Sequence, residues 1–167
     1  RTGLLLLLWG LFQKVVIADS AALIADKVFS LGDPSFPILW GGVFAFAIQI
    51  YGDFSGYTDM ARGSARLLGV ELCKNFEHPY LAQSPGEFWR RWHMSLSTWF
   101  RDYVYIPLGG SRNGSSTMAR NLFITFFLSG LWHGASWNYV IWGSYHGLLV
   151  ALWPLLTKQV PLLADKG

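Results

Sequence analysis

Residues 129–137, SGLWHGASW, lie near the middle of the longest stretch of the chain that carries no formal charge. This stretch, residues 121–157, has thirty-seven residues, whereas a helix that crosses a bilayer needs roughly 20. The tripeptide Gly-Ala-Ser at 134–136 favours a break between two helices. We therefore predict two membrane spans, or one span and a re-entrant segment, that meet beside His133.

His133 is a titratable side chain inside this apolar stretch. Ionisable residues at membrane depth usually face the interior of a helix bundle or a water-filled path, and a broken backbone at that depth must be packed in protein or line a wet cavity. We therefore predict a functional role for His133. His146 lies about four helical turns further along the same stretch. For His146 we predict a structural role as a hydrogen-bonded core histidine.

The composition is that of a membrane protein. Hydrophobic residues make up 52% of the 167 positions and charged residues 14%, against roughly 25% charged residues in soluble proteins. Residues 36–52 form a second apolar run, in which Gln49 is the strongly polar side chain, and we predict that this run spans the membrane. The run at residues 3–12 ends before Lys14 and is too short to span, so we expect a tilted or partly buried helix there. The predicted fold class is all-α, a polytopic membrane helix bundle with interfacial and re-entrant helices.

Basic residues are concentrated between positions 61 and 120, which hold eight basic and four acidic side chains. By the positive-inside rule, this block faces the cytoplasm. The formal net charge of +3 and the pI near 9.1 are then explained by contact with a lipid bilayer. A nucleic-acid-binding protein would instead carry a basic stripe on a soluble fold. We therefore predict no nucleic-acid partner.

Within the basic block, residues 84–107 (SPGEFWRRWHMSLSTWFRDYVYIP) predict a single amphipathic helix. Ser84 and Glu87 have the spacing of a capping box, the proline after Ser84 suits the first helical turn, and a second proline ends the helix. At about 100° per residue, the aromatic side chains fall on one arc, and His93 lies at its polar edge beside the arginines. An interfacial anchor explains the aromatic residues, but a histidine adds nothing to anchoring. We therefore regard His93 as a second candidate functional residue.

Other polar groups give weaker signals. Asp53 and Asp59 are six residues apart, which is not one helical face, and the glycines beside them favour a broken helix end capped by the aspartates. Residues 108–116, LGGSRNGSS, have no strand before them and no lysine in phosphate-loop register, so we predict a loop. Cys73 is the single cysteine, and the two candidate histidines are forty residues apart on separate elements, so the sequence predicts no metal site.

Three blocks of the sequence resemble the core of the membrane-bound O-acyltransferase family, and specifically its bacterial alginate O-acetyltransferase branch. The blocks occur in the family's order and cover nearly the whole chain: YGDFSGYTDMARGSARLLG at 51–69, NFEHPYLAQSPGEFWRRWHMSLSTWFRDYVYIPLGGSR at 75–112, and SGLWHGASWNYVIWGSYHG at 129–147. The resemblance implies a multi-pass enzyme of the bacterial inner membrane that moves an acyl group from a thioester donor, such as acetyl-CoA, toward a hydroxyl acceptor, without a bound cofactor. It also implies that residues 1–167 form a single membrane domain that is part of a longer protein.

The resemblance places catalytic histidines at His133, in the WHG motif, and at His93, in the RWH motif. A hydroxyl is a poor nucleophile at neutral pH and needs a base, which histidine provides. Negative charge developing on a thioester carbonyl needs hydrogen-bond donors, for which Trp132, Asn138 and the second histidine are candidates. Arginines at a cytoplasmic rim suit the phosphates of coenzyme A. We accordingly expect further substrate binding by Arg90, Arg91 and Asp53.

For the alginate-like branch, the resemblance implies an extracytoplasmic polysaccharide acceptor that is reached with the help of periplasmic partner proteins. Two alternatives stay open. A proton-coupled transporter or channel module would use His133 and Asp53 as a proton relay, but it leaves the capped aromatic helix with His93 unexplained. A purely structural bundle would keep the histidines hydrogen-bonded in its core.

Overall fold

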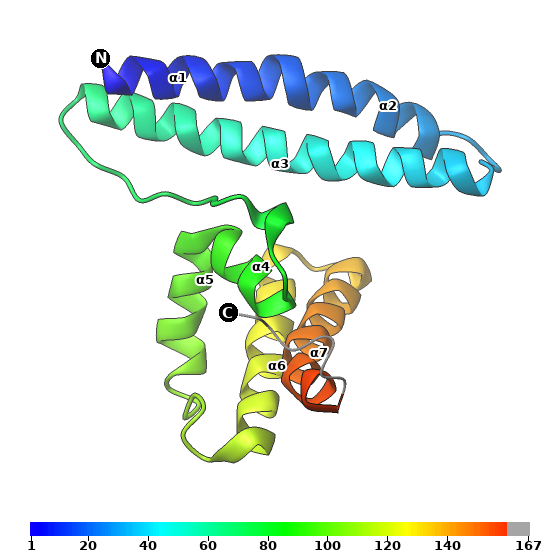
Figure 1. The fold of residues 1–167 in the computed structure, drawn as a ribbon, viewed down its shortest axis with the longest axis vertical. Helices are drawn as coiled ribbons and strands as arrows, with labels where there is room; N and C mark the ends of the chain where they lie inside the picture. The colour runs from blue at the N-terminus through cyan, green and yellow to red at the C-terminus, as the bar shows by residue number, and fades with distance from the viewer. Residues whose placement is uncertain (160–167) are drawn as a thin grey trace. The chain divides into compact units, whose positions relative to one another are not determined.

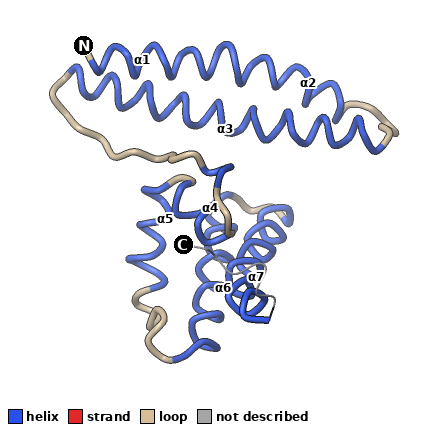
Figure 2. Tube along the Cα trace, in the orientation of Figure 1, coloured by secondary structure: helices blue, strands red, loops and turns tan. Residues whose placement is uncertain are grey.

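The computed structural model describes residues 1–159 and divides the chain into two compact units, residues 1–75 and 76–167. Every regular element in the described range is a helix (Figure 2), which confirms the predicted all-helical class. Segments with π or 3-10 geometry are labelled η. A single membrane domain over residues 1–167 stays a prediction.

The first unit is a helical hairpin (Figure 1). Its first arm is a continuous helical rod made of α1 (Thr2–Phe12), the π-helical η1 (Gln13–Ala18) and α2 (Asp19–Phe29). A turn at residues 30–35 leads into α3 (Phe36–Leu67), which contacts all three segments of the rod. The two arms are therefore antiparallel neighbours along their length.

The arms of this hairpin contact each other through glycines. A Cβ atom built on Gly10 would lie 2.5 Å from the backbone oxygen of Gly56, and one built on Gly63 would lie 2.6 Å from that of Gly3. Neither distance leaves room for a side chain. Helices in membranes associate through such close backbone approach at small residues, because lipid provides no hydrophobic force between them. The glycines near Asp53 therefore serve helix packing, and the broken helix end predicted there is wrong.

Two helices of the described chain are long and apolar enough to cross a bilayer, namely the rod Thr2–Phe29 and the helix Phe36–Leu67. The second contains the span predicted at residues 36–52. A helix is present at residues 3–12, as predicted, but the prediction that it is too short to span is wrong, because it continues past Lys14 as far as Phe29. The crossing of the membrane by further helices stays a prediction.

The second unit contains another helical hairpin, formed by α6 (Gly114–His133) and α7 (Trp137–Gln159). The interruption between them confirms the helix break predicted at residues 134–136. A Cβ atom on Gly143 would lie 2.7 Å from the backbone oxygen of Phe126, so these helices also pack backbone against backbone. That α6 and α7 cross or enter the membrane stays a prediction.

Four short helical segments precede this hairpin: η2 (Pro79–Leu81), α4 (Pro85–Arg91), α5 (Met94–Phe100) and η3 (Arg101–Tyr105). The loop predicted at residues 108–116 is present as far as Asn113, after which α6 begins. The fully buried Asn121 holds this loop, because its Nδ2 donates to the backbone oxygens of Leu108 at 3.1 Å and Gly110 at 2.9 Å.

The start of α4 follows the predicted capping box in part. The Ser84 Oγ accepts a hydrogen bond from the backbone N–H of Glu87 at 3.1 Å. The Glu87 carboxylate accepts from the N–H of Gln83 at 2.7 Å, one residue before the cap, and not from that of Ser84. Both ends of the box are therefore engaged, with the second bond displaced by one residue.

The single helix predicted over residues 84–107 is wrong, because the chain breaks at Trp92 and His93. Trp92 is extended, and His93 adopts a left-handed backbone with φ 44° and ψ 56°. The Trp92 ring packs against Phe76 and Phe88, with ring centroids 5.0 and 5.6 Å apart. This tertiary packing overrides helical continuity. The arc derived from helical periodicity therefore does not extend past the break.

Candidate active site

His93 lies at the junction between α4 and α5 and is half-buried. A left-handed backbone is uncommon for a residue other than glycine and costs about 1–3 kcal/mol, so it persists where the surrounding structure imposes it. Burial lowers the pKa of His93 below its ordinary value of 6.5, and the charge on His133 lowers it further. The two candidate histidines, forty residues apart in the sequence, thus belong to the same compact unit.

His133 is the last residue of α6 and is surrounded by aromatic rings. The ring centroids of Trp132, Tyr139 and Trp142 lie 5.1, 5.8 and 5.0 Å from that of the imidazole. The planes of the Trp132 and Trp142 rings lie at 73° and 79° to the plane of the imidazole, whereas the plane of the Tyr139 ring lies at 23° to it. His133 also keeps part of its surface exposed, so a substrate can reach it.

Trp142 connects His133 to a third histidine. Its indole contacts the imidazoles of both His133, at 5.0 Å, and His146, at 4.9 Å. Trp89 of α4 contacts Trp142 at 5.5 Å, His146 at 5.0 Å and also Phe126 of α6. This aromatic cluster fixes α4 against the α6–α7 hairpin. The half-buried position of His146 fits the structural role that we predict for it, which stays a prediction.

Helix α4 carries the two arginines predicted to bind the acyl donor. Arg91 pairs with Glu87 one helical turn away, with 2.5 Å between Nη2 and Oε1. Arg90 is exposed. The backbone N–H of Gln83 and the charges of Arg91 and Arg90 lower the pKa of Glu87. One guanidinium is therefore engaged within the protein, while the other is exposed to a ligand.

Trp132 and Asn138, the predicted hydrogen-bond donors, lie on either side of the α6–α7 break. Trp132 is 57% exposed and stands directly before His133. Asn138 is exposed in the first turn of α7, where its backbone N–H donates to the Ser136 Oγ at 3.4 Å. The donors and the candidate base are thus supplied by one short segment, residues 132–138.

Asp53 belongs to the first unit, near the middle of α3. Its carboxylate pairs with Lys14 at 2.5 Å, and Lys14 also pairs with Asp19 at 2.8 Å. One face of α3 borders an open cavity of about 410 Å³, which is lined by Phe46, Gln49, Ile50, Asp53, Phe54 and Tyr57. The structure therefore places Asp53 in the first unit and the other six predicted site residues in the second.

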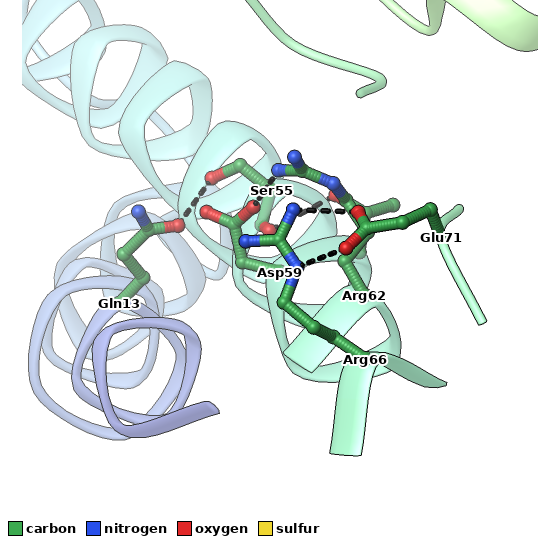
Figure 3. A network of polar contacts seen from close by, with 7 residues as sticks. Gln13, Ser55, Asp59, Arg62, Arg66 and Glu71 are labelled. Carbon is green, nitrogen blue, oxygen red and sulfur yellow. Dashed lines mark hydrogen bonds and ion pairs between the residues drawn. The ribbon is translucent and has the colours of Figure 1, made fainter. Parts of the chain in front are cut away.

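Further polar pairs lie along α3, on the C-terminal side of Asp53 (Figure 3). They are the buried hydrogen bond from Ser55 to Gln13 at 2.7 Å, the Asp59–Arg62 ion pair at 2.9 Å, and the Arg66–Glu71 ion pair at 2.6 Å. The π-helical turn of η1 places the Gln13 amide beside the Ser55 hydroxyl. The Ser55–Gln13 bond thus joins α3 to η1, and the Arg66–Glu71 pair joins α3 to the segment that follows it.

Sequence reasoning missed Tyr139, Trp142 and Trp89 as neighbours of the histidines. Tyr139, Trp142 and His146 follow one another at spacings of three and four residues, which is one face of a helix. Placing this stripe on a helix that begins after the break would have found two of the three. Among the described residues, no group of three His, Cys, Asp or Glu side chains is arranged to hold a metal ion.

A helical membrane protein with two candidate histidines at helix junctions of one unit is the class that the fold and this site define. The model of the membrane-bound O-acyltransferase family matches residues 2–166, and the chain belongs to this family. The family resemblance read from the three sequence blocks is thereby confirmed.

The chain is similar in sequence to several proteins that are named for transfer of acyl groups to cell-surface polymers. The chain is 52% identical over 143 residues to the "Probable alginate O-acetylase" of Pseudomonas putida, covering 86% of this chain and 30% of that protein. It is 44% identical over 151 residues to the peptidoglycan O-acetyltransferase of Helicobacter pylori, covering 90% and 29%. It is 33% identical over 123 residues to the teichoic acid D-alanyltransferase of Bacillus subtilis, covering 70% and 31%. The chain therefore spans about 30% of the length of these relatives.

Proposed function

We propose that the protein containing this chain transfers an acetyl or other acyl group from a thioester donor to a hydroxyl acceptor. The observation that carries the proposal is the position of His133 at the α6–α7 break, exposed among aromatic rings, with His93 half-buried at the α4–α5 junction of the same unit. Membership of an O-acyltransferase family and the names of the relatives support the reaction class.

His133 acts as the general base. Its imidazole takes the proton of the acceptor hydroxyl while the hydroxyl oxygen attacks the thioester carbonyl carbon, after which the carbon–sulfur bond breaks and the thiol leaves. His93 assists as a neutral imidazole, a form that burial favours because it lowers the pKa of His93. A neutral imidazole does not repel the imidazolium that forms on His133, and it can still donate a hydrogen bond.

The negative charge that develops on the thioester oxygen needs fixed donors. The indole N–H of Trp132, directly before His133, and the side-chain amide of Asn138, in the first turn of α7, serve this purpose, so the base and the donors come from one junction. Such donors, aimed at the oxygen as it becomes charged, stabilise the transition state more than the substrate.

The acyl donor is acetyl-CoA or another acyl thioester. The exposed Arg90 guanidinium binds its phosphates, while Arg91 holds α4 in shape through Glu87. In the first unit, Asp53 lines the cavity along α3 and contacts substrate from there, held in place by Lys14.

The acceptor is an extracytoplasmic polysaccharide such as alginate, reached with periplasmic partner proteins from a multi-pass enzyme of the bacterial inner membrane. Similarity to proteins named for alginate and for peptidoglycan supports a polysaccharide. Two helices able to cross a bilayer support the membrane location.

The test is transfer of labelled acetyl from acetyl-CoA in native membranes that contain the whole protein and alginate. Label on polysaccharide or on a partner protein, absent from membranes without the protein, supports the proposal. Proton flux across the membrane without any transferred label would instead support the transporter alternative. If neither transferred label nor proton flux is detected, the structural bundle remains as the explanation of the histidines.

A further inference from the structure

Tyr139 contacts the catalytic candidate His133 differently from the two tryptophans. Its ring lies at 23° to the imidazole with the centroids 5.8 Å apart, which is an offset stack. Trp132 and Trp142 cross the same imidazole at 73° and 79°. A cation within about 6 Å of a tyrosine ring centroid and over its face is attracted by the ring quadrupole. Of these three rings, Tyr139 is the one that lies nearly parallel to the imidazole, so its face is turned toward the plane of that ring.

The backbone of the helix break places the Tyr139 ring at this position. The Tyr139 N–H donates to the carbonyl oxygen of Ser136 at 3.0 Å, which starts α7 directly after the break. The ring then covers Gly134, because a Cβ atom at position 134 would lie 2.9 Å from the Tyr139 Cε2. Gly134 also has φ 156° and ψ 165°, a backbone conformation that side chains disfavour. The glycine after His133 thus makes room for the stack.

We infer that Tyr139 is a positioning residue that holds the His133 imidazole by stacking on it and stabilises the imidazolium formed when His133 accepts the acceptor's proton. The inference rests on the proposed function. No new bond forms at Tyr139. The proton moves from the acceptor hydroxyl to the imidazole, and the positive charge that results lies against the electron-rich face of the tyrosine ring.

Other titratable groups near this stack have assigned places. His93 interacts with His133 from the α4–α5 junction, and His146 contacts the same Trp142 indole from α7. The charged groups of the short helices that pack on this hairpin are Arg90 and the Glu87–Arg91 and Arg101–Asp102 ion pairs. Because a substitution at Tyr139 leaves all of these in place, a change in the pH profile reports on the stack.

The experiment compares Tyr139→Leu, Tyr139→Phe and Tyr145→Leu in the whole protein, using the acetyl-transfer assay across pH 5 to 9. Tyr145 is the matched control, since it lies on the same helix, is exposed and contacts His146. We expect Tyr139→Leu to lower kcat by about 3- to 30-fold. Its acidic limb of kcat/KM should move to lower pH by about half to one unit, because an imidazolium without its π partner loses the proton more readily. Tyr139→Phe keeps the ring face and should keep both values near those of the unmodified enzyme, as should Tyr145→Leu.

A further variant with nearly the same side-chain volume separates the effect of the ring quadrupole from an effect on folding. Trifluorophenylalanine at position 139 weakens the ring quadrupole with little change in volume, so kcat should fall below that of Tyr139→Phe. The inference would be overturned if Tyr139→Leu and the fluorinated protein both keep the kcat of the unmodified enzyme and the same acidic limb of kcat/KM. These outcomes differ from failure of the proposed function, in which the unmodified protein transfers no label or His133→Ala keeps full transfer.

Discussion

The two units of this chain differ in how they hold ionisable side chains among their helices. In the hairpin of the first unit, ion pairs hold several of them: Lys14 binds Asp19 and Asp53, and Arg66 binds Glu71. In the second unit, the histidines are held by aromatic and apolar surroundings, because His133 packs among aromatic rings and His93 is half-buried. Pairing fixes a charge and offsets the cost of keeping it at membrane depth. An imidazole held in an apolar setting stays neutral and able to take up a proton. We therefore expect substitutions of the paired charges in the first unit to act mainly on stability, and substitutions of His133 and His93 in the second unit to act mainly on transfer.

The largest expected effect is that of His133→Ala. We expect acetyl transfer to fall by about 10²- to 10⁴-fold, because a general base is lost. The amount of folded protein in detergent should change little, since the imidazole is partly exposed. The measurement is transfer of labelled acetyl per mole of monodisperse protein.

His146→Ala is the matched control for this substitution, because His146 contacts the same Trp142 indole and is half-buried. Its loss should lower thermal stability more than specific activity, through a cavity in the aromatic cluster. If the folded His133→Ala protein transfers label at the rate of the unmodified protein, the catalytic role proposed for His133 is wrong. Equal destabilisation by both changes would favour a structural bundle.

The second effect concerns the pairing of Lys14 with Asp53. Lys14→Met leaves a carboxylate without its partner between two helices that can cross a bilayer, so the hairpin should lose stability. Adding Asp53→Leu should recover part of the loss, with a coupling energy of about 0.5–3 kcal/mol in a double-mutant cycle. The measurement is thermal unfolding in detergent.

Lys27→Met serves as the control on the same rod, since Lys27 is exposed in the last turn of α2. We expect it to change stability little. Additive effects of the Lys14 and Asp53 substitutions would show that the ion pair does not join the helices. The contrast between the units would then rest on the histidines alone.

The helix break at residues 134–136 could be predicted because a glycine marks it, and the start of α4 could be predicted because Ser84 and Glu87 have capping spacing. The break at His93 could not, since no Gly or Pro is present and Trp92 turns the chain through its contacts with Phe76 and Phe88. The same limit explains the rod of the first unit. In the sequence, the charge of Lys14 ends an apolar run. In the structure, the helix continues through Lys14, which pairs with Asp53, thirty-nine residues later.

The candidate site was predictable in its residue types and not in its geometry. The motifs point to His93 and His133, but helical periodicity did not place the two histidines in one unit, because their positions depend on two breaks and on the packing of α4 against α7. Tyr139 could be identified only once the course of the chain after Gly134 was known.

A third and smaller effect separates the two arginines of α4. Arg90→Gln should raise the apparent KM for acetyl-CoA by about 10-fold and leave the dependence on the acceptor unchanged, because a charge-assisted contact to phosphate acts on donor binding. Arg91→Gln should instead lower stability, since Arg91 pairs with Glu87. Steady-state kinetics with each substrate varied in turn checks both. A donor KM that is unchanged in Arg90→Gln would remove this residue from the donor site.

The smallest expected effect is on the pH dependence of stability, and it should differ between the units. Burial and the charge on His133 lower the pKa of His93, so below its ordinary value of 6.5 the unfolded chain binds a proton that the folded second unit does not. Stability of that unit should therefore decline as the pH falls from 7.5 to 5.5. In the first unit, the hydrogen bond and charge from Arg66 lower the pKa of Glu71 below 4.5, so the stability from this pair is complete above that pH and is lost as the pH falls further.

Hydrogen exchange at pH 7.5 and 5.5, followed separately for peptides from residues 1–75 and 76–159, measures this difference. Protection should fall in the second unit and stay nearly constant in the first over this interval, since the carboxylate remains ionised throughout. His93→Gln removes the titrating ring and should reduce the loss in the second unit. Equal loss of protection in both units, unchanged by His93→Gln, would contradict the assignment of the pH-sensitive chemistry to the second unit.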